Sequence, residues 1–210
     1  MTHDMTMMLA VHDALRRDLE RLVRATERPD DDPGQVLGAA VGWELFKRHL
    51  HVHHTSEDAV LWPALERRLA GRPADLALLS AMEAEHAVID PLLAGVDAAL
   101  ADREHGPQRL GGAVEALTAC VRTHLRHEEH DALPLIAATL PESEWQAFGE
   151  SHRERIGDQA RRYLPWMLDG ADPVTAAAVL GGMPQPLLAA YEAEWRPAYE
   201  ALARWPVTTR

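Results

Sequence analysis

Histidine and acidic residues recur in two matching stretches of the sequence. The first stretch, His53 to Pro63, reads HHTSEDAVLWP, and the second, His124 to Pro134, reads HLRHEEHDALP. Both follow the pattern His-x-x-x-Glu-acid and end in an apolar residue and proline. Residues four positions apart lie on one face of an α-helix, so each stretch presents an imidazole and a carboxylate toward one point. Both groups ligate transition metals, and the repeat therefore predicts a metal site.

The elements that must position these side chains are expected to be helices. Hydrophobic residues make up 47% of the 210 residues, and Ala and Leu dominate them. Both are strong helix formers, and proline and glycine divide the chain into helical segments. The first four expected helices span residues 4–27, 35–69, 73–103 and 107–140. Short connections make consecutive helices antiparallel neighbours, so the predicted fold is all-α, an up-down-up-down four-helix bundle.

The remaining residues, 141–210, are expected to form a helical extension packed on the bundle of residues 1–140. A fifth helix is expected over residues 142–163, followed by a break over 165–170. A short helix over 173–181, capped by Asp172, and a closing helix over 185–204 complete the extension. Inside the bundle, Pro63, Pro91 and Pro134 are each expected to kink or locally break a helix.

Two single histidines, His12 and His86, complete the predicted metal site. We compare how far the histidines on two consecutive expected helices lie from the connection between these helices. At most connections the two distances agree within about one helical turn. The predicted ligand set therefore combines four imidazoles and two carboxylates: His12, His53, Glu57, His86, His124 and Glu128. Two iron ions suit this set best, with zinc, manganese or copper possible in principle. Cations would also offset the cost of burying two carboxylates in a bundle.

This pattern resembles the hemerythrin-like, or HHE cation-binding, family over roughly residues 4 to 140. The resemblance implies an oxo- or hydroxo-bridged diiron centre with Glu57 and Glu128 as the bridging carboxylates. It also implies that His12 and His53 serve one iron. His86 and His124 would serve the other.

One departure from the family pattern concerns the residue one turn after His86. Oxygen-carrying hemerythrins have a second histidine there, whereas this chain has Asp90 followed by Pro91. Either Asp90 is a ligand, or that iron lacks one protein ligand. Open coordination positions are what a catalytic metal requires. The departure weakens a role as reversible oxygen carrier and favours reaction with peroxide, dioxygen or nitric oxide.

Residues near the predicted ligands are expected to play lesser parts. Asp58 and Glu129 follow the two bridging candidates and are expected to be solvated, or else to hydrogen-bond a ligand histidine. His152 is expected to be structural or exposed. Five further histidines are expected at the surface or just outside the ligands: His49, His51, His54, His127 and His130.

Charge and cysteine content limit the possible partners and location. The net charge of −12 disfavours binding to nucleic acid or to anionic lipid. The single cysteine, Cys120, fits a reducing compartment. The first residues lack the features of a signal peptide, and no apolar run is long enough to cross a membrane. The sequence therefore predicts a cytoplasmic protein, with its oligomeric state left open.

Three functions agree with these patterns. The first is a diiron protein that reacts with dioxygen, hydrogen peroxide or nitric oxide, including catalase- or peroxidase-like detoxification. The second is a sensor or store of oxygen, nitric oxide or iron without turnover. The third is a structural bundle with adventitious metal or zinc. The sequence does not decide whether the chain is an enzyme.

Overall fold

The computed structural model describes residues 3–27, 41–202 and 204–205, and these residues form helices with no strand among them. The long helices are interrupted by three π-helical turns (η1, η2 and η4) and one 3-10 turn (η3). In chain order the elements are α1 (Thr6–Thr26), α3 (Val41–Ser56), η1 (Glu57–Leu61), α4 (Trp62–Arg68), α5 (Pro73–Ala101), α6 (Gly106–His127), η2 (Glu128–Ala132), α7 (Leu133–Thr139), α8 (Glu142–Ile156), η3 (Gly157–Gln159), α9 (Ala160–Leu168), α10 (Pro173–Gly181), α11 (Gln185–Ala190), η4 (Tyr191–Trp195) and α12 (Arg196–Glu200).

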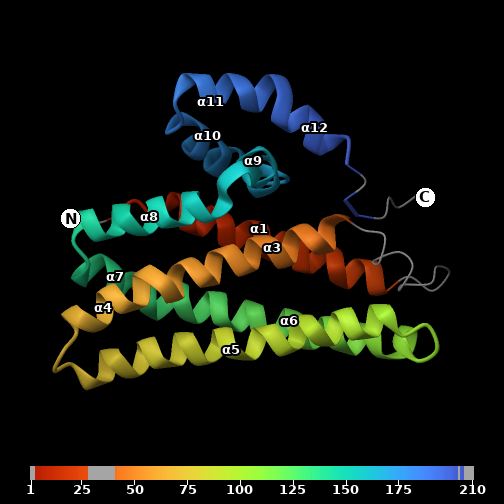
Figure 1. The fold of residues 1–210 in the computed structure, drawn as a ribbon, viewed down its shortest axis with the longest axis horizontal. Helices are drawn as coiled ribbons and strands as arrows, with labels where there is room; N and C mark the ends of the chain where they lie inside the picture. Colours follow the sequence, from red (N-terminus) through yellow and green to blue (C-terminus); the bar gives the residue numbers. More distant parts are fainter. Residues whose placement is uncertain (1–2, 28–40, 203, 206–210) are drawn as a thin grey trace.

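Four long helical segments lie side by side in the lower part of Figure 1. They are α1, the run from α3 to α4, α5, and the run from α6 to α7. Each segment begins at the end of the molecule where the previous one stops, so neighbouring segments run in opposite directions (Figure 1). Their observed bounds match the expected ones within a few residues, except that residues 28–40 lie outside the described part of the chain.

Two of the internal prolines follow π-helical turns. The backbone N–H of Trp62 donates to the carbonyl of Glu57, and that of Leu133 donates to Glu128, each five residues back. Proline lacks an N–H and its ring collides with the carbonyl four residues earlier. A wider turn just before Pro63 and Pro134 relieves this conflict, so the expected local break takes the form of a π turn. Pro91, by contrast, lies inside the continuous helix α5.

The buried apolar side chains form two separate clusters. Along each of the four segments, one cluster lies before the histidine and acidic residues and the other lies after them. Along the run from α3 to α4, for example, Phe46 and Leu50 belong to the first cluster, whereas Leu61 and Leu65, after the acidic residues, belong to the second. The polar side chains therefore occupy a layer between two apolar half-cores.

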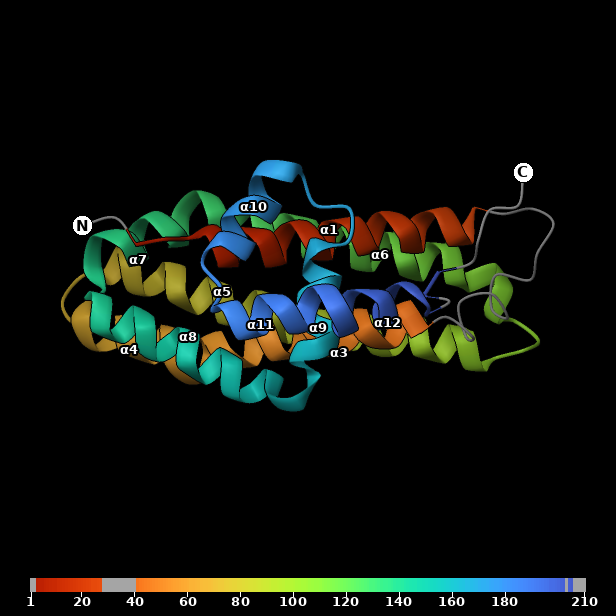
Figure 2. The ribbon, with the colours of Figure 1, turned by 90° about the horizontal axis from the view of Figure 1, so that it is seen from above.

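Residues after 141 pack against two of these segments. In Figures 1 and 2, α9 to α12 lie above α1 and α3, while α8 runs beside α3 and η1. Arg17 of α1 donates to the carbonyl oxygens of Met167 and Asp169, and the indole N–H of Trp166 donates to buried Asp18 at 2.7 Å. These contacts fix the extension to the outside of α1.

The break expected over residues 165–170 is confirmed only in its last two residues. Pro165 lies inside α9, which continues to Leu168, and the helix then ends at Asp169 and at Gly170, whose φ is 79°. The chain also changes course earlier, at the 3-10 turn that begins at Gly157, whose φ of 52° lies in the left-handed region that favours glycine. Burial of Trp166 and Met167 offsets the hydrogen bond that Pro165 cannot make. The expected cap is confirmed, because Asp172 accepts from two backbone N–H groups at the start of α10.

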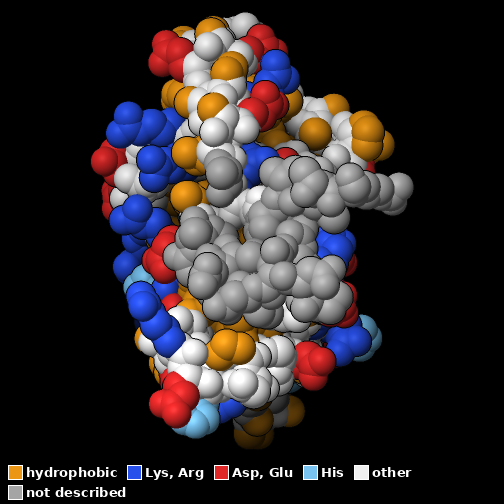
Figure 3. Space-filling model, turned by 90° about the vertical axis from the view of Figure 1, so that its right-hand side faces the viewer, with side chains coloured by type: hydrophobic (Ala, Val, Ile, Leu, Met, Phe, Trp, Pro, Cys, Tyr) orange, Lys and Arg blue, Asp and Glu red, His pale blue; other side chains and the backbone are white. Residues whose placement is uncertain are grey.

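In the described part of the chain, no helix combines the length and the apolar character needed to cross a membrane. Seen from the right-hand end of Figure 1, acidic and basic side chains are mixed on this face, with basic ones most frequent along its left flank (Figure 3).

Candidate metal centre

The polar layer contains two groups of side chains whose donor atoms converge. Within each group, the donor atoms lie within 4.8 Å of one another. The first group comprises His12, His53, Glu57 and Glu128, and the second comprises His54, His86 and His124. The six residues predicted from the sequence are therefore all brought together, and they are at most 7% exposed.

The two glutamates lie between the groups. One oxygen of Glu57 lies 3.3 Å from Nε2 of His53, and its other oxygen lies 3.5 Å from Nε2 of His86. Oε2 of Glu128 lies 3.3 Å from Nε2 of His12 and 3.9 Å from Nε2 of His124. Each carboxylate thus faces one imidazole of the first group and one of the second. A carboxylate that binds two cations at once would need this position.

Imidazole nitrogens meet in pairs at the centre of each group. Nε2 of His12 lies 3.0 Å from Nε2 of His53, and Nε2 of His86 lies 3.1 Å from Nε2 of His124. The four rings therefore turn the same atom inward. A cation placed within either group would meet two imidazole lone pairs.

The buried polar atoms at the centre lack hydrogen-bond partners. Glu57 and Glu128 are both 0% exposed, and none of their four carboxylate oxygens is hydrogen-bonded. Nε2 of His54 is also buried without a partner. An unpaired buried carboxylate is very costly, and native proteins pair such groups or use them to hold metals. These donors therefore fit a pair of cations.

Outer carboxylates fix the orientation of the inner rings. Nδ1–H of His12 donates to Glu129 at 2.8 Å, and Nδ1–H of His86 donates to Asp58 at 2.8 Å. Each of these acids directly follows one of the two central glutamates, so the sequence repeat includes this hydrogen bond as well. Of the two expectations for Asp58 and Glu129, a hydrogen bond to a histidine of the donor groups is the one observed. Such bonds fix the tautomer and turn Nε2 toward a metal.

A third outer carboxylate, Glu85 of α5, was missed in the sequence. It accepts from Nδ1–H of His124 at 2.9 Å and from Nδ1–H of His127 at 2.7 Å. No repeat marks Glu85, and the only signal is its position directly before His86.

Burial and neighbouring charges shift the pKa values of the central side chains in opposite directions. Burial and the nearby Glu128 raise the pKa of Glu57 well above its ordinary value. Burial opposes a charge on His12, but Glu128 and Glu129 outweigh it and raise the pKa of His12 to about 9. Burial lowers the pKa of His53 and that of His54 well below their ordinary values. These two imidazoles are therefore neutral, which is the state that ligates metal.

His54 corrects one expectation. It was expected at the surface or outside the ligands, but it is buried, and its ring stacks on that of His86 with centroids 4.0 Å apart. Neighbouring residues on a helix point about 100° apart, so His53 and His54 can each face a different cation when two cations lie side by side. The adjacent histidines were the sequence signal for this arrangement.

Asp90, the alternative ligand considered in the sequence, lies elsewhere. It is exposed and belongs to neither donor group. It lines a pocket of about 180 Å³ between α3 and α5, together with Asp58 and Glu83. The side chain that converges with His86 and His124 is that of His54, not that of Asp90.

Two histidines next to the site contact the extension. His49 is buried, and its ring lies 4.2 Å from that of Trp166 and 4.9 Å from that of Tyr163. His152 of α8 lies against the ring of His53 at 6.3 Å, with Nε2 3.3 Å from the hydroxyl of Tyr163. Burial lowers the pKa of His152 to about 4, so it is a neutral side chain beside the donors. The more distant His51 and His130 are exposed, as expected.

Comparison with known proteins gives one match. The family model of the hemerythrin HHE cation-binding domain matches residues 3–136, a span that contains every residue of both donor groups. No curated protein and no solved structure matched the chain. Because the matched span covers more than half of the chain and carries the complete donor set, the chain belongs to the hemerythrin HHE cation-binding domain family.

Proposed function

We propose that this chain holds two iron ions and reacts with small oxidants, namely dioxygen, hydrogen peroxide or nitric oxide. In this proposal residues 1–140 form the up-down-up-down four-helix bundle of a diiron protein, and residues 141–210 are an extension packed on it. The observation that carries the proposal is the pair of buried, unpartnered carboxylates, Glu57 and Glu128, each placed between the two groups of imidazoles.

The donor set favours iron over other cations. It contains imidazole nitrogens and carboxylate oxygens but no thiolate, whereas closed structural zinc sites are tetrahedral and usually include cysteine. Zinc, manganese and copper are therefore less suitable occupants. In the proposed assignment, His12 and His53 serve one ion and His54, His86 and His124 serve the other.

The side chains of the protein perform three tasks. Glu57 and Glu128 neutralise cationic charge at the centre and join the two halves of the site. Asp58, Glu85 and Glu129 hold the Nδ1–H groups so that Nε2 faces inward. The apolar clusters on either side exclude water from the layer.

Two bound ferrous ions would supply the two electrons that reduce a peroxide. The first donor group offers two imidazoles where the second offers three, so the first leaves more room for an exogenous ligand. An open position of this kind distinguishes a reactive metal site from a closed structural one. The reaction is therefore expected on the His12–His53 side.

Metal analysis of protein expressed with iron tests the ligand assignment. We expect about two irons per chain and an absorption spectrum typical of a bridged ferric pair. His53→Ala should lose iron, whereas His51→Ala, which removes an exposed histidine from the same helix, should keep it. Equal iron content in both variants, or zinc in place of iron in the wild type, would overturn the proposal.

Peroxide consumption separates the catalytic role from that of a sensor or store. With an added reductant that returns both irons to the ferrous state, the iron-loaded protein should consume hydrogen peroxide over many turnovers, and Glu128→Gln should abolish this activity. Reversible spectral changes with oxygen or nitric oxide and no turnover would favour the sensor.

The single free cysteine fits the proposed cytoplasmic location.

A further inference from the structure

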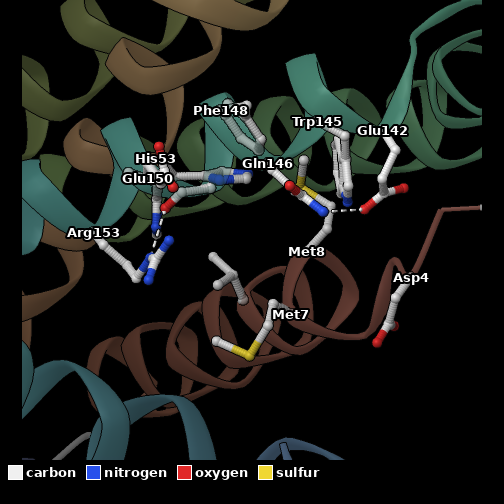
Figure 4. Close-up of a pocket in the computed structure, with 13 residues that line it drawn as sticks. Asp4, Met7, Met8, His53, Glu142, Trp145, Gln146, Phe148, Glu150 and Arg153 are labelled. Carbon is white, nitrogen blue, oxygen red and sulfur yellow. Dashed lines mark hydrogen bonds between the residues drawn. The ribbon is translucent and has the colours of Figure 1, made fainter. Parts of the chain in front are cut away.

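A cavity of about 410 Å³ lies between α1 and α8 and adjoins the first donor group. Eight of its thirteen lining residues belong to α8, which lies beyond the matched span 3–136, and His53 is another of the thirteen. The extension therefore supplies most of a wall that reaches a proposed metal ligand. Figure 4 shows α1 on one side of the cavity and α8 on the other.

The size of the cavity exceeds what small oxidants need. A water molecule takes about 30 Å³ of liquid volume, so hydrogen peroxide needs roughly twice that. Cavities that bind small organic molecules measure about 300 to 1,000 Å³. The observed volume of about 410 Å³ lies in that class.

The lining is apolar inside and charged at the rim. Met7 and Met8 of α1 face Trp145 and Phe148 of α8 (Figure 4), and Val11 of α1 also lines the cavity. The charged lining residues are Asp4, Glu142, Glu150 and Arg153. Methionine and aromatic side chains bind apolar groups without a fixed shape, because thioethers are flexible and aromatic faces are broad.

Two imidazoles give this apolar cavity a polar spot. His53 is a proposed ligand of the less crowded donor group, and His152 lies against it. A ligand that fits the whole cavity needs an apolar body and one small polar end. This polar end would lie at the site proposed to reduce peroxides. A peroxide group would be both small and polar, and it would be the group that reacts there.

We propose that this cavity binds an organic hydroperoxide, R–O–O–H, with an apolar R group of about six to nine carbon atoms and the peroxide end toward His53. The proposal rests on the proposed function for the identity of the polar end, whereas binding of the apolar body rests on the cavity alone. The extension is then the part of the chain that selects the substrate.

Gly149 offers a direct way to fill the cavity. It lines the cavity from α8, and a Cβ added there would meet no heavy atom within 4 Å. Gly111 of α6 is a matched control, because it is also half-buried in a helix with nothing within 4 Å of an added Cβ, yet it does not line the cavity. Gly149→Phe and Gly111→Phe both replace a glycine within a helix by phenylalanine. The two substitutions should therefore change helix stability to a similar extent.

Binding is measured with cumyl alcohol, which has the body of cumene hydroperoxide but no peroxide bond. Calorimetry and ligand-detected NMR on the metal-free protein should show binding that Gly149→Phe weakens at least tenfold and Gly111→Phe leaves unchanged. No binding to the wild type at millimolar alcohol, or an equal loss in both variants, would overturn the proposal. If Gly149→Phe does not fold by circular dichroism, Gly149→Leu makes the same test with a smaller side chain.

Reaction of the iron-loaded protein adds a second readout. In a single turnover, the two ferrous ions would give up two electrons, and cumene hydroperoxide with two protons from solvent would become cumyl alcohol and water. The rate of this single turnover, relative to that with hydrogen peroxide, should fall at least tenfold in Gly149→Phe. Consumption of hydrogen peroxide but not of cumene hydroperoxide by the wild type would overturn the proposal and leave the proposed function standing. Alcohol binding without turnover of either peroxide would instead refute the proposed function and retain the cavity as a binding site.

Discussion

Replacing Glu57 by glutamine should stabilise the metal-free protein and destabilise the metal-loaded one. The Glu57 carboxyl is fully buried, neither oxygen is hydrogen-bonded, and burial with the nearby Glu128 raises its pKa well above the ordinary 4.5. The folded metal-free chain therefore keeps a proton that the unfolded chain releases. A glutamine of the same shape needs no proton.

The size of the effect follows from proton linkage. Below about pH 4.5 both states of the chain hold the proton, and the contribution of Glu57 is fully present. Above that pH the unfolded chain binds fewer protons, so the free energy of unfolding falls by about 1.4 kcal/mol per pH unit until the raised pKa is reached. At pH 7 the loss amounts to at most roughly 3 kcal/mol, and Glu57→Gln should recover much of it.

Urea unfolding of the metal-free protein between pH 5 and pH 8 measures this difference. The wild type and Glu57→Gln should diverge as the pH rises, since every other titrating group is common to both proteins. Glu66→Gln, which changes an exposed glutamate on α4, should follow the wild type. With iron added the order should reverse, because glutamine is a poor bridging ligand. Parallel pH curves, or a less stable metal-free Glu57→Gln, would refute the reasoning about the buried carboxylate.

Three further changes test the layers around the site. Glu129→Gln should weaken metal binding about 10- to 100-fold without removing a donor, which competition with a chelator measures; an unchanged affinity would show that this acid does not orient His12. His54→Ala should reduce the iron content from about two per chain to about one by metal analysis, and retention of both irons would place His54 outside the ligands. Trp166→Phe should lower the free energy of unfolding by about 1 to 3 kcal/mol, because it leaves buried Asp18 without this donor; a wild-type urea midpoint would contradict that role.

The sequence was sufficient for the helices and for most of the side chains that converge at the centre, because both depend on local periodicity. The four-residue spacing of His53 to Glu57 and of His124 to Glu128 places both side chains on one face of any α-helix. It could therefore be interpreted without knowing how the helices pack. The family match confirms the resemblance on which the metal-binding interpretation rested. The identity of the metal and the ligand roles stay predictions.

Features that depend on packing between distant segments could not be predicted from local periodicity. The burial of His54 depends on where α5 lies, and periodicity within one helix does not give that position. Pro165 was expected to end a helix, but the packing of its neighbours on α1 outweighs the lost hydrogen bond. The wall that α8 adds beside His53 follows from the path of the chain after Leu140, for which the sequence carries no repeat.

The division of the apolar core by a polar layer has a consequence for folding cooperativity. Two half-cores joined only by the helices that pass through the layer share few side-chain contacts, so either could open while the other stays closed. Cations held by residues from all four long segments would link the two halves and make the molecule unfold as one unit. In native-state hydrogen exchange, the metal-free chain should then reveal two opening units, which merge into one when the metals are bound.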